Sequence, residues 1–442
     1  MISQDAFTSG RGLIGTILSK MNNIGKVQAS FLLHIMIMFL SMRGRINFLQ
    51  LGRYGVMDEH SYRYHFSKDF DWVGFNRRFV DEQCSDEKIL AFDASYLSKS
   101  GKSTYGVGYF YSGCHGQYER GMEIGCFAAI DLKQNTAYHL LATQTEYRKK
   151  KDTSDLVNQY CEMLKDNAAE LLQVSNILAV DAWFYKAEYI NTCIAEGFEC
   201  ITRMRDDANL RYIFNGKQKE GKGRPKKYGD KVNLNKIDKR RFKLVQTIDD
   251  VKIYECTLYC VMLKSNVKVA YVEFFNKKGD VQMYKIFMST NLDRDAMTIV
   301  RYYKSRYQME FNFRDAKQHT GLQHCQARDK AKLDFHFNAS LTSVNIAKSL
   351  SRRDVDKNQS TPISIEDIKT ELSNKLLLDL FLSNFEIDPQ LIKNESIISK
   401  ILNYGKKQPD FFSEPLLILN PQKKILKQYS RHLKKQKVIT TN

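Results

Sequence analysis

Two short apolar segments, each ending in an aspartate, constrain the fold of this chain more than any other feature. They are Lys88–Asp93 and Asn176–Asp181, and short apolar runs bounded by turn-forming residues are typical of buried strands. Between them, Ser154–Leu172 has apolar residues at helical spacing. A second helical segment, Lys186–Glu196, then precedes another apolar run, Phe198–Met204. This alternation predicts parallel strands joined by helical crossovers in an α/β sheet.

The segments around the first aspartate predict that the sheet also contains antiparallel strands. We predict a second strand at Thr104–Ser112 and expect it to form a hairpin with the first across a turn-rich stretch. Glu123–Leu132 and Thr136–Leu141 predict a third strand and its continuation. The predicted fold class is therefore α/β, a mixed sheet with flanking helices. It places Asp93 and Asp181 at the carboxyl ends of buried strands, where open α/β sheets bind their ligands.

Changes in composition along the chain predict five segments. The first has helical patterns with interleaved arginines and aromatic residues, which suits either contact with a DNA backbone or a charged helical surface. In chain order, we predict a helical N-terminal region that binds DNA (1–85), the first part of an α/β core (86–205), a β-rich basic insertion (206–289), the second part of the core (290–350) and a helical basic C-terminal region (351–442).

The charge balance of the chain indicates a polyanionic partner. Lys and Arg number 68 against 50 Asp and Glu, which gives a formal net charge of +18. A hydrophobic content of 43% argues for a folded protein, and so large a basic surplus in a folded protein is most often matched by nucleic acid. An anionic membrane surface is a weaker alternative, because the basic residues are spread along the chain rather than gathered on one amphipathic helix.

The nine cysteines and the amino terminus predict an intracellular protein. The cysteine count is odd and no C-x-x-C pair occurs, which argues against a disulfide framework and against a zinc site. The amino terminus lacks the ordered basic, apolar and small-residue regions of a signal peptide. The apolar run Phe31–Leu40 is too short to span a bilayer. We therefore expect a cytoplasmic protein without a membrane segment, in which Phe31–Leu40 forms a buried helix.

A late segment without Pro or Gly, Tyr302–Thr320, predicts a helix with a polar stripe. At about 100° per residue, four polar side chains fall within about 60° of one another. These are Tyr303, Arg306, Glu310 and Lys317, with Arg314 close by. A neighbouring, mostly apolar stripe can pack on a core. Such a helix is either a solvated face with i,i+4 ion pairs or a site in which a carboxylate is flanked by cations.

Glu310 joins Asp93 and Asp181 as a third candidate site acid. Carboxylates gathered without His or Cys suit a hard cation such as Mg²⁺ or Mn²⁺. Two such ions can activate a nucleophilic oxygen and stabilise the leaving oxygen of a phosphodiester, whereas three carboxylates alone would repel one another. Either aspartate taken singly is readily explained as a turn former or a helix cap, so the prediction depends on the three acids together.

The spacing of the four stripe residues, Y-x2-R-x3-E-x6-K, together with the two earlier aspartates closely resembles the DDE transposases of bacterial insertion sequences. More narrowly, the chain from about 86 to 330 resembles the insertion-sequence-four family. The resemblance implies an RNase H-like catalytic core in which Asp93, Asp181 and Glu310 bind two Mg²⁺ (or Mn²⁺) ions. It implies Mg²⁺-dependent cleavage at transposon ends and strand transfer into target DNA, by a cut-and-paste route. The implied partners are double-stranded DNA (terminal inverted repeats and target) and a second copy of the chain, in a homodimer on paired ends at the bacterial nucleoid.

The resemblance also implies which side chains contact DNA. The candidates for phosphate contact are Tyr303, Arg306, Arg314 and Lys317. An aromatic residue after the second aspartate, Trp183 or Phe184, would hold a flipped base; otherwise these rings pack under the strand end. The basic loop 217–231 would be an arm along the DNA backbone, or else a solvated loop. Its candidate residues are Lys222, Arg224, Lys226 and Lys227.

Two other functions are compatible with the same residues. A DNA-binding protein descended from a transposase would keep these acids after losing catalysis, and a metal-dependent nuclease would hydrolyse DNA without strand transfer. Nucleotide binding is rejected, because Gly101-Lys102-Ser103 has Tyr96 where a P-loop needs its first glycine. We therefore expect no nucleotide cofactor.

Overall fold

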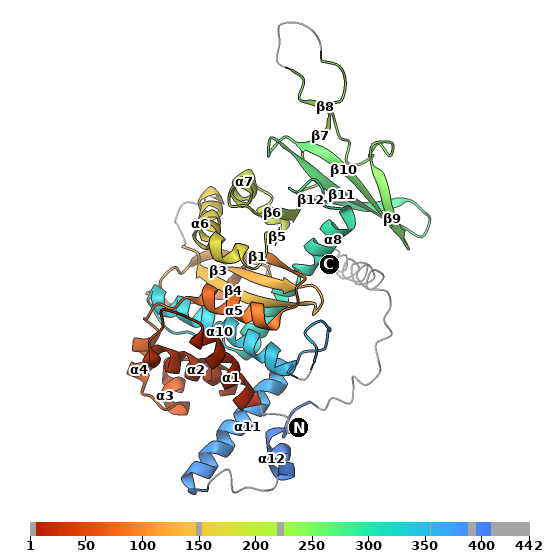
Figure 1. The fold of residues 1–442 in the computed structure, drawn as a ribbon. Helices are drawn as coiled ribbons and strands as arrows, with labels where there is room; N and C mark the ends of the chain where they lie inside the picture. Colours follow the sequence, from red (N-terminus) through yellow and green to blue (C-terminus); the bar gives the residue numbers. More distant parts are fainter. Residues whose placement is uncertain (1–5, 147–152, 219–224, 354, 388–394, 408–442) are drawn as a thin grey trace.

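The computed structural model of the chain describes residues 6–146, 153–218, 225–353, 355–387 and 395–407. Within these ranges, the strands form one mixed sheet with helices on both faces, and further helices lie together at one end of the molecule (Figure 1). This confirms the predicted fold class, a mixed α/β sheet with flanking helices and helical terminal regions, and it is consistent with an RNase H-like fold. None of the described helices is long and apolar enough to cross a membrane.

The sheet has twelve strands within the described residues, in the order β2-β3-β1-β5-β6-β12-β11-β10-β7-β8, with β4 also paired to β3 and β9 to β10. The earlier strands are β1 (Lys88–Ser98), β2 (Gly108–Ser112), β3 (Gln117–Asp131), β4 (Thr136–Gln144), β5 (Ile177–Val180) and β6 (Glu199–Arg203). The later strands are β7 (Leu210–Ile213), β8 (Tyr228–Lys231), β9 (Lys243–Ile248), β10 (Val251–Cys260), β11 (Ser265–Phe275) and β12 (Val281–Ser289). Because β12 pairs with β6, the strands after residue 206 continue the same sheet.

The pairing of β1 differs from the predicted hairpin. β1 pairs antiparallel with β3 along its whole length, from Lys88 opposite Asp131 to Ser98 opposite Gly121, and β2 pairs with β3 instead. The predicted hairpin between the first two strands is therefore wrong. The reason is length: β3 has 15 residues and covers all 11 residues of β1, whereas β2 has only 5.

Three further details of the strand prediction are corrected. Thr136–Leu141 does not continue β3; it belongs to β4, which folds back on β3 after a turn in which Asn135 has a φ of 53°. Asn tolerates this left-handed conformation better than most residues. β1 continues to Ser98 because its alternate residues stay buried, so Asp93 lies inside its strand rather than at the end. Asp181 does follow directly after its strand, but that strand is the fifth rather than the fourth.

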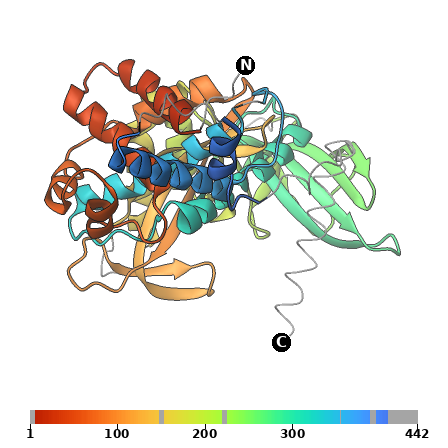
Figure 2. The same ribbon diagram turned by 90° about the horizontal axis from the view of Figure 1, so that it is seen from below.

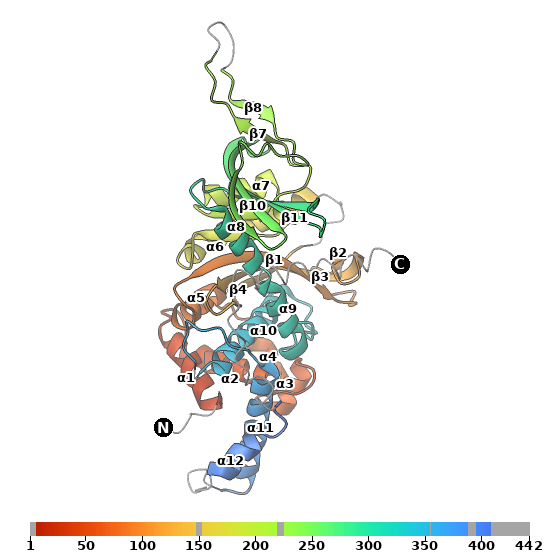
Figure 3. The ribbon, with the colours of Figure 1, turned by 90° about the vertical axis from the view of Figure 1, so that its right-hand side faces the viewer.

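The helices lie in two layers around the sheet. The N-terminal helices are α1 (Ala6–Ser19), α2 (Lys26–Ser41), α3 (Phe48–Tyr54), α4 (Glu59–His65) and α5 (Trp72–Gln83). The later helices are α6 (Thr153–Leu172), the 3₁₀ helix η1 (Ala182–Phe184), α7 (Ala187–Ala195), α8 (Ala296–Ser305), α9 (Gln308–His319), α10 (Lys330–Ser351), α11 (Ile365–Asn384) and α12 (Glu395–Leu402). Helices α6 and α7 cover one face of the sheet, and α5, α9 and α10 cover the other (Figures 1 and 3).

One end of the molecule consists mainly of helices and the other mainly of strands. The N-terminal helices lie at one end and β7–β12 at the other (Figure 2). The predicted buried helix at Phe31–Leu40 is confirmed as α2, which packs against α10 and α11. Helix α8 packs on β6, β11 and β12. It therefore connects the late strands to α9, which returns to the central strands.

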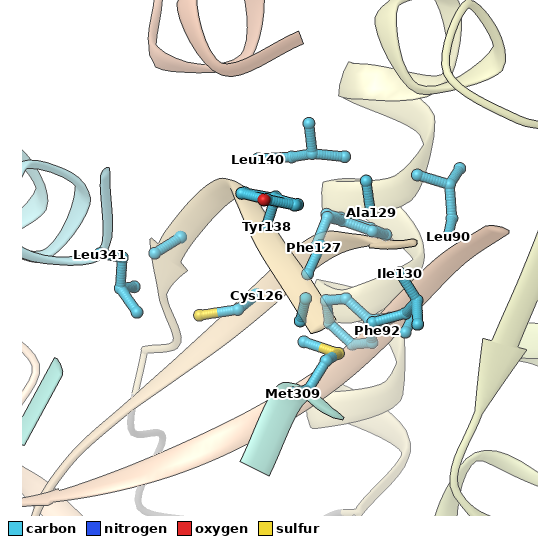
Figure 4. Packing of buried hydrophobic residues seen from close by; sticks show 14 of the residues in the cluster. Leu90, Phe92, Cys126, Phe127, Ala129, Ile130, Tyr138, Leu140, Met309 and Leu341 are labelled. Atoms are coloured by element: carbon cyan, nitrogen blue, oxygen red, sulfur yellow. The ribbon is translucent and has the colours of Figure 1, made fainter. Parts of the chain in front are cut away.

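Phe92 lies at the centre of the core between β1 and the helices α6 and α7 (Figure 4). Its side chain is fully buried. The ring packs on those of Tyr160 and Tyr189 at centroid distances of 5.3 and 5.9 Å. Because successive residues of a strand point to opposite faces, this packing turns Asp93 toward the other side, where α8 meets α9.

Phe92→Ala is expected to lower the free energy of unfolding by about 3–5 kcal/mol, because it removes a fully buried ring and leaves a cavity. The control is Phe381→Ala, which truncates a ring that is 54% exposed on α11, and which should change that free energy by less than about 0.5 kcal/mol. Chemical denaturation followed by circular dichroism measures both. Equal losses in the two variants would contradict the central place of Phe92 in the core.

Candidate active site

The single helix predicted for 302–320 is two helices in the structure, α8 and α9, joined by a tight turn at Arg306 and Tyr307. The turn contains i→i−3 hydrogen bonds, such as the one from Glu310 N to Tyr307 O at 3.1 Å. Ser305 Oγ donates to the carbonyl three residues before it at 2.8 Å, and serine bonds of this kind often bend helices. The single-helix prediction is thus wrong at this turn, and the turn places the Arg306 side chain over β1 and β5.

The side chains of Asp93, Asp181 and Glu310 converge on one guanidinium, that of Arg306. The parallel register of β1 and β5 sets the two aspartates side by side. Arg306 Nη1 donates to Asp93 Oδ2 at 2.7 Å, and Nη2 donates to Asp181 Oδ1 at 3.2 Å. Nη2 also lies 4.0 Å from Glu310 Oε1. The structure therefore brings together the three predicted acids, with the predicted arginine between them.

Exposure to solvent differs across this carboxylate cluster (Asp93, Asp181 and Glu310). The exposed fractions of the side chains are 9% for Arg306, 22% for Asp93, 39% for Asp181 and 46% for Glu310. The guanidinium thus lies on the inner side of the cluster. The carboxylates of Asp181 and Glu310 remain accessible to a ligand that arrives from solvent.

Two neighbours hold Asp181 in place. Tyr303 OH donates to Asp181 Oδ1 at 3.0 Å, and Thr202 Oγ1 donates to Asp181 O at 3.1 Å. The Tyr303 hydroxyl, predicted to contact a phosphate, therefore contacts a site acid in this structure. Thr202 was not predicted as a site residue; its one sequence signal is its place near the end of the strand that follows Asp181.

Burial raises the pKa of both Asp93 and Glu310, and the Arg306 guanidinium opposes the shifts. The pKa of Glu310 rises to about 7, because the two aspartates add to the effect of burial. Burial by itself would lower the pKa of Arg306, but the adjacent aspartates raise it above its usual value, so the guanidinium stays charged. One cation among three carboxylates leaves the cluster short of positive charge.

In the metal-free protein, stability is expected to fall as the pH rises from about 4.5 to about 7. Because the pKa of Glu310 is about 7 in the folded chain against an ordinary value of 4.5, the folded state binds the proton more tightly, and deprotonation favours unfolding across this window. Glu310→Gln should flatten the unfolding temperature against pH between these limits, measured with a chelator present. The effect is modest, since the side chain is 46% exposed and solvent screens it. Identical pH profiles for both proteins would contradict the raised pKa.

The donor set of the carboxylate cluster fits Mg²⁺ or Mn²⁺. Carboxylate oxygens are the ligands that these ions prefer, and the three acids already face one common cation, Arg306. Among the described residues, no group of three acidic, His or Cys side chains is already arranged to hold an ion. We therefore expect metal binding to require displacement of the guanidinium from the point where the carboxylates converge.

Of the two predicted aromatic residues, Trp183 is exposed and Phe184 is buried. Both follow Asp181 in η1. Trp183 is 40% exposed, and Lys186 Nζ lies 3.3 Å from the centroid of its ring. Phe184 packs in the core on Phe92, with ring centroids 5.2 Å apart. Trp183 is thus the exposed member of the pair, and Phe184 packs under the strand end.

Lys317 and Arg314, both on α9, have different surroundings. Lys317 Nζ donates to Tyr96 O at 2.9 Å, and burial lowers the pKa of Lys317. Arg314 is exposed, pairs with Asp315 at 2.7 Å and lies over the Phe311 ring at 4.7 Å. Lys317 therefore ties α9 to β1 on the side of the acids, whereas Arg314 is accessible to a partner.

The predicted basic arm is described in part. Lys226 and Lys227 are exposed, and Lys226 Nζ lies 5.1 Å from the centroid of the Phe214 ring. Lys222 and Arg224 lie outside the described residues. The flanking strands β7 and β8 are at one edge of the sheet (Figure 3), so contact between this loop and DNA stays a prediction.

Residues 85–346 match a protein-family model described as "Transposase DDE domain". The match covers well over half of the chain and includes Asp93, Asp181 and Glu310. No curated protein matches the chain.

Proposed function

The chain belongs to the family of transposase DDE domains, and from this membership and the geometry of the carboxylate cluster we propose that it cuts DNA at transposon ends and joins them to target DNA. The observation that carries the proposal is the convergence of three acids, from distant parts of the chain, on one cation. We also propose membership of the insertion-sequence-four family, on the Y-x2-R-x3-E-x6-K spacing from Tyr303 to Lys317, and a cut-and-paste route.

In this proposal, Asp93, Asp181 and Glu310 hold two Mg²⁺ or Mn²⁺ ions. Such ions, when bound, activate an attacking oxygen and stabilise the leaving oxygen of a phosphodiester. Tyr303 keeps the Asp181 carboxylate oriented through its hydrogen bond. Arg306, once displaced from the acids, is placed at the α8–α9 turn to neutralise a phosphate of the bound strand.

The chemistry proceeds in two attacks on phosphorus. Water first attacks the phosphodiester at the transposon end, and the bond to the 3′ oxygen breaks, which leaves a 3′-hydroxyl. That hydroxyl then attacks a phosphodiester of target DNA, so that a new bond forms as the target strand breaks. The opening of the carboxylate cluster toward Asp181 and Glu310 supports entry of DNA from that side.

The proposed DNA interface extends beyond the acids. Trp183 is proposed to stack on a flipped base, and Arg314 with the basic arm to contact the backbone. Lys317 is proposed to hold a phosphate where α9 meets β1. We further propose that the protein acts as a homodimer on paired transposon ends at the nucleoid. We also propose that the five segments, with boundaries at 85, 205, 289 and 350, have separate functions.

The decisive experiment is cleavage of labelled DNA that carries the element's own ends. The full chain is expected to cut it with Mg²⁺ or Mn²⁺, and not with Ca²⁺ or chelator, because Ca²⁺ binds with looser geometry than the reaction needs. Asp93→Ala should remove the activity. Binding without cutting under every metal would favour a DNA-binding descendant that has lost catalysis. Cutting without joining of pre-cut ends to target would favour a nuclease that only hydrolyses.

A further inference from the structure

Three cationic side chains gather on the face of the sheet that α8 covers. Arg203 ends β6 and lies opposite Phe287 of β12. Lys285 is two residues before Phe287 on the same strand and so points to the same face. Lys304 follows Tyr303 on α8, and the Tyr303 ring packs on Phe287 with centroids 4.9 Å apart. These residues form a cationic cluster (Arg203, Lys285 and Lys304) around one aromatic contact.

The charges of the cationic cluster repel one another. Burial lowers the pKa of Lys285 to about 8, and Arg203 adds to this effect. Burial likewise lowers the pKa of Lys304 to about 8, and Lys285 adds to it. Asp206 opposes this repulsion: it lies 3.8 Å from Arg203 Nη2, and its charge acts to raise the pKa of Lys285. Its side chain is 63% exposed, so attraction across these pairs is weak. Partly buried cations in this situation are stabilised by an anion that enters between them.

The Arg203 guanidinium also has an unused donor. Its Nε is buried and has no hydrogen-bond partner within the described part of the chain. A buried donor without an acceptor costs about 1–3 kcal/mol. A phosphate oxygen supplies the acceptor and the negative charge together, and guanidinium geometry suits it.

Two members of the cationic cluster directly follow, in the sequence, the two residues whose side chains hold Asp181. Thr202, which bonds Asp181 O, precedes Arg203, and Tyr303, which bonds the carboxylate, precedes Lys304. We propose that the cationic cluster binds a backbone phosphate of the DNA strand held in the active site. The inference rests on the proposed function and deepens it, since it names the side chains that position the strand.

The test is the salt dependence of DNA binding by the full chain in Ca²⁺, with a labelled 30-base-pair duplex carrying an element end as the probe. Lys285→Met and Lys304→Met are each expected to lower the slope of log Kd against log[NaCl] by about 0.9, the value for one phosphate contact. Methionine keeps the apolar stem of either lysine and removes its charge, so the two changes test the contribution of the charge. The matched control is Lys133→Met, an exposed lysine in the β3–β4 turn at the far end of β1, which should keep the wild-type slope.

Each outcome decides the question. A wild-type slope in both cluster variants would overturn the phosphate site and leave the transposase proposal intact, because the wild-type protein would still bind and cut. No binding of the duplex by wild-type protein would overturn both. A second measurement needs no DNA: inorganic pyrophosphate, at matched ionic strength, should raise the unfolding temperature of wild-type protein more than that of Lys285→Met. Equal shifts in the two proteins would show that Lys285 does not bind the anion.

Discussion

Glu310→Gln is expected to reduce cleavage of transposon-end DNA by more than about a hundredfold while its affinity for the same DNA stays within about twofold. Outer partners of a metal site typically contribute about 10–100-fold to affinity or activity, and a ligand contributes more. Glutamine keeps the size of the side chain but removes the charge that would hold a cation. The side chain is 46% exposed, so its replacement disturbs packing little.

The matched control for this change is Glu366→Gln. Glu366 is 45% exposed and pairs with His319 at the other end of α9, at 3.1 Å. It therefore has the exposure of Glu310 and contacts the same helix, but lies away from the carboxylate cluster. Full cleavage by Glu366→Gln, with none by Glu310→Gln, assigns the role to the site acid. Wild-type cleavage by Glu310→Gln would remove it from the proposed active site.

Arg306→Met is expected to lower the free energy of unfolding by about 3–5 kcal/mol in the presence of a chelator, the range for losing one partner of a buried ion pair. The side chain is 9% exposed and bonds Asp93 and Asp181, so its loss leaves neighbouring carboxylates without a counter-charge. Added Mg²⁺ should restore much of the lost stability, because a divalent cation supplies that charge at the same place. Thermal unfolding with and without Mg²⁺ measures the effect.

Arg314→Met serves as the control for this prediction. Arg314 is on α9, its side chain is 52% exposed and its partner is Asp315, so the change should cost less than about 0.5 kcal/mol and show little additional response to Mg²⁺. If Arg306→Met were no less stable than Arg314→Met, or gained nothing from Mg²⁺, the guanidinium would not be the counter-charge of the acids. That result would also weaken the proposal that metals bind where Arg306 lies.

The residue pattern within each segment predicted much of the fold. The parts that were predicted wrongly depend on which strands pair with one another, which the pattern within a segment does not show. The apolar runs before Asp93 and Asp181 and the helix between them were predicted because their periodicity lies within each segment. The strand that pairs with β1 was not predicted correctly, because β2 and β3 both follow β1 and both have strand patterns. Only the length of β3, which matches the whole of β1, shows that β3 is the partner. The continuation of β1 past Asp93 was missed because an acid on the opposite face of a strand does not end it.

The sequence indicated which residues meet at the candidate site, but not how the chain arranges them. Three acids, Arg306 and Tyr303 meet as a group, which residue types and spacing indicated. The turn at Arg306 was missed because no Pro or Gly marks it, and the serine bond that accompanies it is not visible in the helical pattern. Arg203 and Lys304 were not predicted either, because charged residues near strand and helix ends are common and their meeting depends on how α8 packs.

Because the two aspartates come long before Arg306 in the sequence, the ribosome makes the acids well before their counter-charge. Asp181 and Arg306 are 125 residues apart in sequence, and a ribosome adds about 5–20 residues per second. The strands that hold the two aspartates therefore emerge roughly 6–25 s before the turn that neutralises them. During this interval the nascent chain has neither Arg306 nor Glu310. If the proposed function is right, DNA cleavage by a chain still on the ribosome has to wait until Arg306 and Glu310 have been added, because the carboxylate cluster is incomplete before then.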